Sequence, residues 1–268
     1  MKIIGVDFTS APGRDKKIVV AECRYARKEL SVVKLTGFAD WPAYELWLGS
    51  NDEWVGGFDF PFGLPRRFID RQGWSGTWPK MIASCVAGGK EAFVEAGMRA
   101  FMSAGSVADK HRRTDRVAGS HSPLKTKTNP PVGRMFYEGA WRLLTHRIRV
   151  PRMNETASSK IAVEAYPGYF ARAIGIHHYK NDKLASAGRN REARRDILRA
   201  LHSGHHPLDL KVRMRDSLRD IILADASGDA LDSILCAVTA AWAEKQPRFG
   251  IPADVDVCEG WIVGAREP

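Results

Sequence analysis

The sequence predicts an α/β domain in which a mixed five-stranded sheet is flanked by helices, with a helical insertion after the fourth strand. Three strand-like segments precede the first helical one, which indicates an antiparallel meander. Later strands alternate with helices, which indicates a parallel half. The chain has 268 residues, of which 44% are hydrophobic, and this is enough to bury one full core. We therefore expect a single domain over residues 1–268.

The first three strands are predicted at 1–8, 17–25 and 30–38. The first is a nearly continuous apolar run, which is typical of a buried strand. The other two are rich in Val and Ile, and the short charged connection between them predicts a hairpin. These three segments form the antiparallel half of the predicted sheet.

A short helix at 40–47, with Asp40 as its N-cap, leads into a fourth strand at 53–60. Residues from about 64 to 155 contain several helical patterns, the pair Pro130-Pro131 and no clear strand. We identify this stretch as the helical insertion.

The last part of the chain returns to alternating elements. A fifth strand is predicted at 161–166, and helical patterns follow near 191–201, 211–223 and 228–245. Residues 259–264 form either a terminal strand or an extended tail. Five strands result.

Three acidic residues end predicted strands in the same local pattern. Asp7, Asp59 and Glu164 each follow a Gly or Ala two residues earlier, on the same face of the strand. A buried carboxylate without a partner costs several kcal/mol, so three of them call for a compensating cation. The small neighbour is expected to leave room for a shared ligand pocket. The alternative is that each acid is paired with an arginine or lies in solvent.

Two further acids lie at the start of the last predicted helix. Asp229 and Asp232 are three residues apart, so they neighbour each other beside the apolar stripe of that helix. Acids in a first turn commonly complement the helix macrodipole, which gives Asp229 a purely structural alternative. Asp232 lies deeper along the helix and is the better ligand candidate.

The positive charge of the chain is concentrated in its middle. The net charge is +10, and residues 106–160 carry twelve Lys and Arg against four acids. Such an excess favours a polyanionic partner, with a solvated surface loop as the alternative. The candidate contacts to a nucleic-acid backbone are Arg112, Arg113, Lys125 and Lys127.

Several classes are disfavoured by what the sequence lacks. It has no apolar run long enough to span a membrane and no secretory leader pattern. Its four cysteines are scattered without a C-x-x-C pair, which argues against a zinc or disulfide framework and favours a reducing cytoplasm. The motifs of serine hydrolases, zinc proteases and Walker-type ATPases are also missing.

Four motifs, in this order, resemble the family catalogued as domain of unknown function 429, whose members are predicted nucleases of the ribonuclease H-like superfamily. They span most of the chain and are Gly5-Val6-Asp7, Asp59-Phe60-Pro61-Phe62-Gly63-Leu64-Pro65, Glu164-Ala165-Tyr166-Pro167 and Asp229-Ala230-Leu231-Asp232. One departure is Ser233, where the family usually has a small apolar residue. The resemblance implies a ribonuclease H-like fold in which Asp7, Asp59 and Asp232 or Asp229 bind metal. Glu164 would be an accessory ligand or position the water.

The function implied by this resemblance is metal-dependent hydrolysis of phosphodiester bonds. In ribonuclease H-like enzymes two metal ions about 3.5–4 Å apart clamp the scissile phosphate, and hard carboxylates suit Mg²⁺ or Mn²⁺. One alternative is a non-catalytic nucleic-acid-binding or adaptor protein on the same fold. A second is a nucleotide-binding ATPase of the actin and heat-shock chaperone type. That class needs a second glycine-rich phosphate turn, whereas here Asp59 runs into Phe60-Pro61-Phe62.

Overall fold

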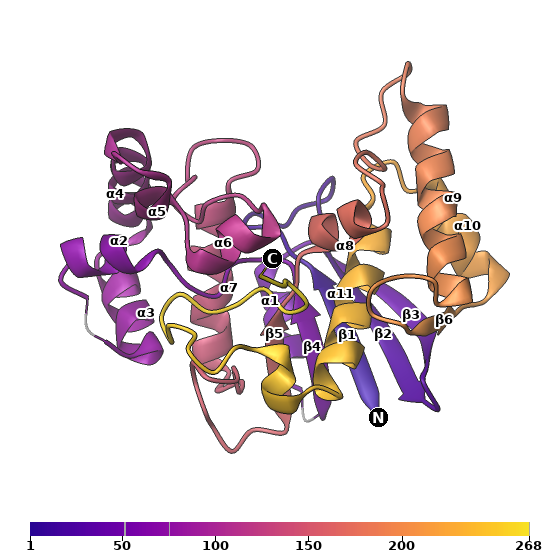
Figure 1. Cartoon of the computed structure of the whole chain (residues 1–268), viewed down its shortest axis with the longest axis horizontal. Helices are drawn as coiled ribbons and strands as arrows, with labels where there is room; N and C mark the ends of the chain where they lie inside the picture. The colour runs from indigo at the N-terminus through magenta and orange to yellow at the C-terminus, as the bar shows by residue number, and fades with distance from the viewer. Residues whose placement is uncertain (51, 75, 268) are drawn as a thin grey trace.

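The computed structural model describes residues 1–50, 52–74 and 76–267, and a mixed six-stranded sheet forms its centre. The spatial order is β5-β4-β1-β2-β3-β6 (Figure 1). The α/β class and the mixed sheet are confirmed, whereas the predicted number of five strands is wrong. The strands are β1 (Lys2–Asp7), β2 (Ile18–Ala26), β3 (Glu29–Phe38), β4 (Trp54–Phe58), β5 (Lys160–Glu164) and β6 (Lys211–Arg213).

The sheet has an antiparallel half and a parallel half, as the order of segments predicts. Strands β1, β2 and β3 form an antiparallel meander. Strand β4 lies parallel to β1, and β5 lies parallel to β4. The carboxyl ends of β1, β4 and β5 therefore meet at one end of the sheet, where the strand-end acids lie.

Strand β6 is absent from the five predicted strands, because the sequence pattern of 211–223 predicts a single helix. The strand has only three residues and pairs in parallel with Glu29–Ser31 of β3. Arg213 also forms an ion pair with Glu29, with 2.9 Å between Nε and Oε2. A segment this short shows no periodicity, so only its tertiary partner reveals it.

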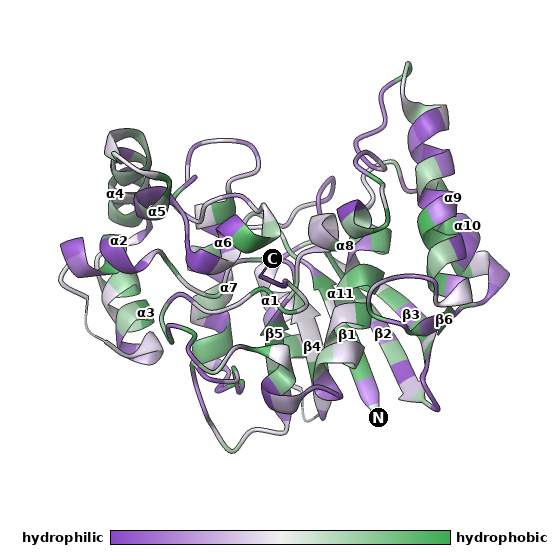
Figure 2. Ribbon diagram, in the orientation of Figure 1, coloured by the Kyte–Doolittle hydropathy of each residue, from purple (hydrophilic) through white to green (hydrophobic). Residues whose placement is uncertain are grey.

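Helices cover both faces of the sheet, as Figure 1 shows. The first face carries the long helix α11, which packs against β1, β2 and β4. The hydrophobic core on this face also includes residues of α8, α9 and α10. Hydrophobic residues (green in Figure 2) cover much of α11 and the central strands, whereas hydrophilic residues recur along α9. These helices are α8 (Pro167–Ala173), α9 (Ala187–Ser203), α10 (Asp216–Ala224) and α11 (Asp229–Glu244).

The second face is covered by α1 and by helices whose residues lie between β4 and β5 in the sequence. Helix α1 (Trp41–Leu48) begins as predicted, because the Asp40 carboxylate accepts a hydrogen bond of 2.9 Å from the Ala43 amide. The remaining helices occupy the predicted insertion. They are α2 (Arg66–Arg71), α3 (Trp78–Ala87), α4 (Lys90–Ser103), α5 (Val107–Lys110), α6 (Arg113–Ala118) and α7 (Val132–Thr145).

Two glycines let α11 lie directly on the sheet. A Cβ atom on Gly5 would stand 1.9 Å from the carbonyl oxygen of Ser233, and one on Gly57 would stand 2.1 Å from that of Cys236. These glycines were expected to leave room for a ligand pocket, and the structure gives a different reason. The backbone of α11 fills that room, and this close packing brings the first turn of α11 to the ends of β1 and β4.

The free edge of β5 is partly covered by other segments. Arg149 bridges to Ile161 near the beginning of the strand, and Ile262 bridges to Glu164 at its end. After the single-turn helix η1 (Pro247–Gly250), residues 251–267 form turns with one isolated bridge at Ile262, so the predicted terminal strand or extended tail at 259–264 is not found. All four cysteines are buried and free. None of the described helices is long and apolar enough to cross a membrane.

Candidate metal centre

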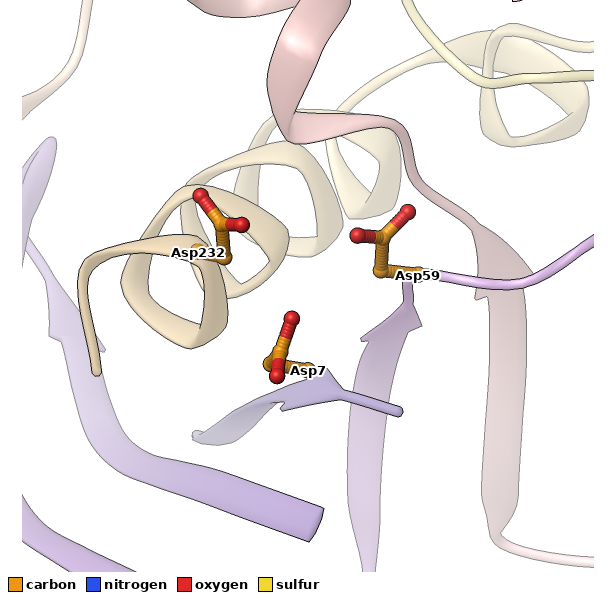
Figure 3. Close-up of side chains that lie close together, drawn as sticks. All are labelled: Asp7, Asp59 and Asp232. Atoms are coloured by element: carbon orange, nitrogen blue, oxygen red, sulfur yellow. The ribbon is translucent and has the colours of Figure 1, made fainter. Parts of the chain in front are cut away.

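Three carboxylates from three different elements converge at the carboxyl end of the sheet (Figure 3). Asp7 ends β1, Asp59 directly follows β4, and Asp232 lies in the first turn of α11. One oxygen from each lies within 4.8 Å of the other two. Ligand oxygens around Mg²⁺ stand about 2.0–2.1 Å from the ion, so a small closing movement would let all three bind it. Hard carboxylate oxygens also suit Mg²⁺ and Mn²⁺.

The electrostatics of this triad favour the binding of a cation. Burial raises the pKa of Asp7 well above its ordinary value, and the charges of Asp232, Asp229 and Asp59 raise it further, against the influence of Lys16. Burial, followed by the charge of Asp232, raises the pKa of Asp59 to about 7. The carboxylates are therefore costly to hold ionised together, and a divalent ion would relieve this cost.

Two lysines and a tyrosine, none of them identified from the sequence, lie among these acids. Lys180 Nζ stands 2.5 Å from Asp232 Oδ2, and the Tyr179 hydroxyl donates to Asp232 Oδ1 over 2.6 Å. Lys16 Nζ stands 2.5 Å from Asp229 Oδ1 and 3.5 Å from Asp7 Oδ2. Within the described part of the chain, no side chain pairs with the Asp59 carboxylate.

Asp229 lies beside the triad and is not needed to cap its helix. The Asp225 carboxylate does this instead, because it accepts hydrogen bonds from the amides of Ala230 at 2.8 Å and Ser227 at 3.0 Å. Asp229 is nearly buried, and its carboxylate faces Lys16. Asp229 still lies in the first turn of α11, where its charge also complements the helix macrodipole.

Glu164 lies apart from the other acids. Its register places it beside Phe58, which in turn is beside Val6, on the face of the sheet opposite Asp7. Both of its oxygens pair with Arg112, at 2.7 and 2.8 Å, and one also accepts a hydrogen bond of 3.0 Å from the Phe62 amide. Burial raises the pKa of Glu164 even though Arg112 opposes this shift. Glu164 thus anchors the segment after β4 rather than joining the triad.

Arg112, expected to contact nucleic acid, is enclosed in the protein. Its side chain is 1% exposed, and its guanidinium donates to Asp115, to Glu164 and to the carbonyl of Glu259. The donors of this group are already engaged by these partners, which disfavours the predicted contact with nucleic acid. A buried arginine between two carboxylates is held in place because leaving either acid unpaired is costly.

The other three predicted contacts are closer to the surface, but two of them are paired. Arg113 forms ion pairs with Asp254 at 2.8 Å and Glu267 at 2.6 Å. Lys127 pairs with Glu95. Lys125 stands 3.4 Å from a ring nitrogen of His121 and has no acidic partner among the residues that the structure describes. Part of the positive charge of this stretch is thus used within the molecule, by the ion pairs of Arg112, Arg113, Lys127, Arg142 and Arg149.

A cleft of 810 Å³ opens onto the acids, and its lining includes Asp7, Asp59, Lys16 and Lys180. A second cleft of 660 Å³ lies beside the segment between α8 and α9. The two clefts share lining residues, namely Ile176, His177, His178, Lys180 and Asn181. The two clefts are therefore neighbours, and the second also touches residues of α9.

The triad gives a direct expectation for stability. Millimolar Mg²⁺ or Mn²⁺ should raise the melting temperature of the wild type, because a ligand that binds only the folded state stabilises it by about 2.7 kcal/mol at 100 times its Kd. Asp59→Asn should melt higher than the wild type in chelator and gain little from metal. Melting curves of both proteins, with chelator and with metal, provide the measurement, and identical metal responses would contradict the assignment.

The rise in melting temperature caused by metal should also depend on pH. The pKa of Asp59 is raised to about 7, so the folded protein holds a proton there that metal binding must release. The metal-induced rise in melting temperature should therefore grow from pH 6 to pH 8. The advantage of Asp59→Asn in chelator should grow in the same direction, because ionisation of Asp59 destabilises the metal-free fold. A metal response that falls over this range would contradict the raised pKa.

The comparisons with known proteins identify the family. The model of the family described as "Protein of unknown function (DUF429)" matches residues 5–256, which is nearly the whole chain. The chain belongs to this family, as the four motifs indicated. No curated protein and no solved structure matches it.

Proposed function

From membership of this family and the geometry of its carboxylates, we propose that the protein is a metal-dependent nuclease that hydrolyses phosphodiester bonds. The observation that carries the proposal is the convergence of Asp7, Asp59 and Asp232 within 4.8 Å, with Asp7 and Asp59 lining a cleft. Three acids from separate elements, one of them unpaired among the described residues, are expensive to maintain unless a cation binds them.

The topology supports a ribonuclease H-like assignment of the fold. Three antiparallel strands, β1 to β3, are followed by two parallel strands, β4 and β5, on the other side of β1. The acids lie at the ends of the two central parallel strands and on the helix packed across them. Strand β6 extends this arrangement by one short edge strand.

The chemistry follows from the residues at the base of the cleft. Asp7, Asp59 and Asp232 would hold Mg²⁺ or Mn²⁺, which, when bound, lowers the pKa of a water molecule and polarises a phosphate oxygen. Lys16 and Lys180 place positive charge beside the carboxylates, where a phosphodiester would enter. Both ammonium groups attract a phosphate group electrostatically.

The second cleft is the proposed path of the nucleic-acid strand. Its lining includes Lys183 and Arg189, neither of which forms an ion pair with a described residue, together with His177 and His178. Cations without an ion-pair partner, in a cleft next to the one that Asp7 and Asp59 line, suit a sugar-phosphate backbone. We therefore propose the lining of the second cleft as the main contact with nucleic acid, in place of Arg112 and the other ion-paired residues of 106–160.

Salt dependence tests this path. Lys183→Gln with Arg189→Gln should weaken nucleic-acid binding and lower the slope of log affinity against log salt by about 0.7 to 0.9 for each phosphate group that is no longer neutralised. The double variant Lys125→Gln with Lys127→Gln removes equal charge from the predicted basic stretch and serves as the matched control. If only the control lowers the slope, the strand lies along the stretch predicted from the sequence.

The proposed activity is tested with a panel of single-stranded, duplex and hybrid DNA and RNA substrates in Mg²⁺ and Mn²⁺. We expect at least one of these substrates to be cleaved. A chelator should abolish this cleavage, and added metal should restore it. Binding of nucleic acid without cleavage in either metal would favour the adaptor alternative. The same panel applied to Asp7→Asn and Asp59→Asn distinguishes cleavage by the triad from cleavage by a contaminant.

A further inference from the structure

We propose that Lys16 takes the place of a second metal ion, so that the site binds one divalent cation rather than two. This inference rests on the proposed function and deepens it. The sequence resemblance implies a pair of ions, whereas the arrangement at the base of the cleft favours one ion and one ammonium group. Four observations on the described residues support it.

The first observation is the balance of charge. Four carboxylates gather here, those of Asp7, Asp59, Asp232 and Asp229. Lys16 and Lys180 contact three of these acids directly. Two ammonium groups leave two negative charges unbalanced when every acid is ionised, and one divalent ion compensates them. A second ion would leave an excess of positive charge before substrate binds.

The second observation is the lack of free ligands for another ion. Outside the triad, the acids predicted from the sequence as ligands are Asp229 and Glu164. Asp229 is paired with Lys16 at 2.5 Å, and Glu164 is paired with Arg112 on the opposite face of the sheet. A second ion would have to displace Lys16 from Asp229, because the buried Arg112 holds Glu164.

The third observation is where the Lys16 ammonium lies. It stands between Asp229 and Asp7, at 2.5 and 3.5 Å, and so shares Asp7 with the triad. Asp7 would thus hold the ion and also contacts the Lys16 ammonium group. The position of Lys16 is therefore that of a second cation.

The fourth observation is that Lys16 faces the cleft. Its side chain is 46% exposed and contributes to the lining of the 810 Å³ cleft. Lys180, the other ammonium group, contacts only Asp232 among the acids. Lys16 is thus the cation that both bridges two carboxylates and can reach a phosphate in the cleft.

The role of Lys16 in hydrolysis follows from this position. A water oxygen bonds to phosphorus, the bond from phosphorus to the leaving oxygen breaks, and a proton from the attacking water passes through solvent to the leaving oxygen. The second ion of a two-metal site stabilises the charge on that leaving oxygen. The Lys16 ammonium does this as a fixed positive charge and keeps its own proton.

The test is a count of bound Mn²⁺ ions, independent of activity. Titration calorimetry gives the number of ions bound to each chain, and electron paramagnetic resonance detects the coupling between two neighbouring Mn²⁺ ions. We expect one uncoupled ion in the wild type and in Lys16→Arg, which keeps the charge. In Lys16→Gln, Asp229 is released and a second, coupled ion should bind.

Lys17→Gln is the matched control, because it removes the same charge from the next residue. Lys17 forms no ion pair with a described residue, so this variant should still bind one ion. Two coupled ions in the wild type would overturn the inference and leave the proposed metal site intact. A Lys16→Gln protein that binds one ion with unchanged affinity would also overturn it. No binding of Mn²⁺ to the wild type would overturn both this inference and the proposed function.

Discussion

Asp7→Asn and Asp59→Asn should each lower metal-dependent phosphodiester cleavage at least about 100-fold while the protein remains folded. Losing a hydrogen-bond partner of a metal ligand typically costs 10–100-fold, and losing the ligand itself should cost no less. The amide that replaces each carboxylate has nearly the same shape but carries no charge, so it binds a hard cation poorly. Initial rates on the best substrate of the panel, at saturating Mn²⁺, provide the measurement.

The control for these variants is Asp15→Asn. Asp15 lies in the same connection as Lys16, is exposed and is not part of the triad, so its loss should change the rate little. Far-ultraviolet circular dichroism checks that each variant is folded. Wild-type activity in Asp7→Asn, in preparations free of contaminating nuclease, would refute the catalytic role of the triad.

Gly5→Ala should destabilise the fold by about 3 kcal/mol or more, at the upper end of what overpacking usually costs. The new methyl group would stand 1.9 Å from the Ser233 carbonyl oxygen and 2.3 Å from the Ala237 amide nitrogen, both in the backbone of α11. A backbone cannot rotate away as a flexible side chain can, so the whole helix must move off the sheet. For a chain of this size the melting temperature should fall by roughly 6–12 °C.

Gly13→Ala is the matched control for this variant. A Cβ atom at Gly13 would have no heavy atom within 4 Å, so the melting temperature should stay close to that of the wild type. Gly57→Ala, whose Cβ would stand 2.1 Å from the Cys236 carbonyl oxygen, should behave like Gly5→Ala. If Gly5→Ala has the same melting temperature as the wild type, the direct packing of α11 on β1 is contradicted.

Much of the fold could be predicted because its main elements carry periodic patterns. The first strands, α1 and α11 are confirmed within a few residues, since a buried strand and an amphipathic helix each have a recognisable spacing. Strand β6 could not be found in this way, because three residues next to a helix show no period. The role of Gly5 was also misinterpreted. A small residue indicates a close approach but not what approaches.

The candidate site likewise contains residues that the sequence predicts and residues that it does not. Asp7, Asp59 and Asp232 can be predicted to converge because they lie in, or directly after, regular elements whose ends meet. Lys16 and Lys180 were missed because they lie in connections whose course depends on tertiary packing. The only sequence signal of Lys16 is that it lies within ten positions of Asp7, and that of Lys180 is that it follows Tyr179. Basic residues in such positions are too common to be selected as site residues. The burial of Arg112 could not be predicted, because a basic stretch does not show which of its cations is buried.

The edges of the sheet, finally, bear on the behaviour of this protein at high concentration. An open edge strand offers unpaired amides and carbonyls to other molecules and can start intermolecular β-pairing. One edge here is β6, which has only three residues, and the other is β5, to which Arg149 and Ile262 bridge. The β5 edge is thus shielded, whereas β6 pairs only with Glu29–Ser31 of β3, so among the described residues 32–38 form the stretch of edge at which intermolecular β-pairing would begin.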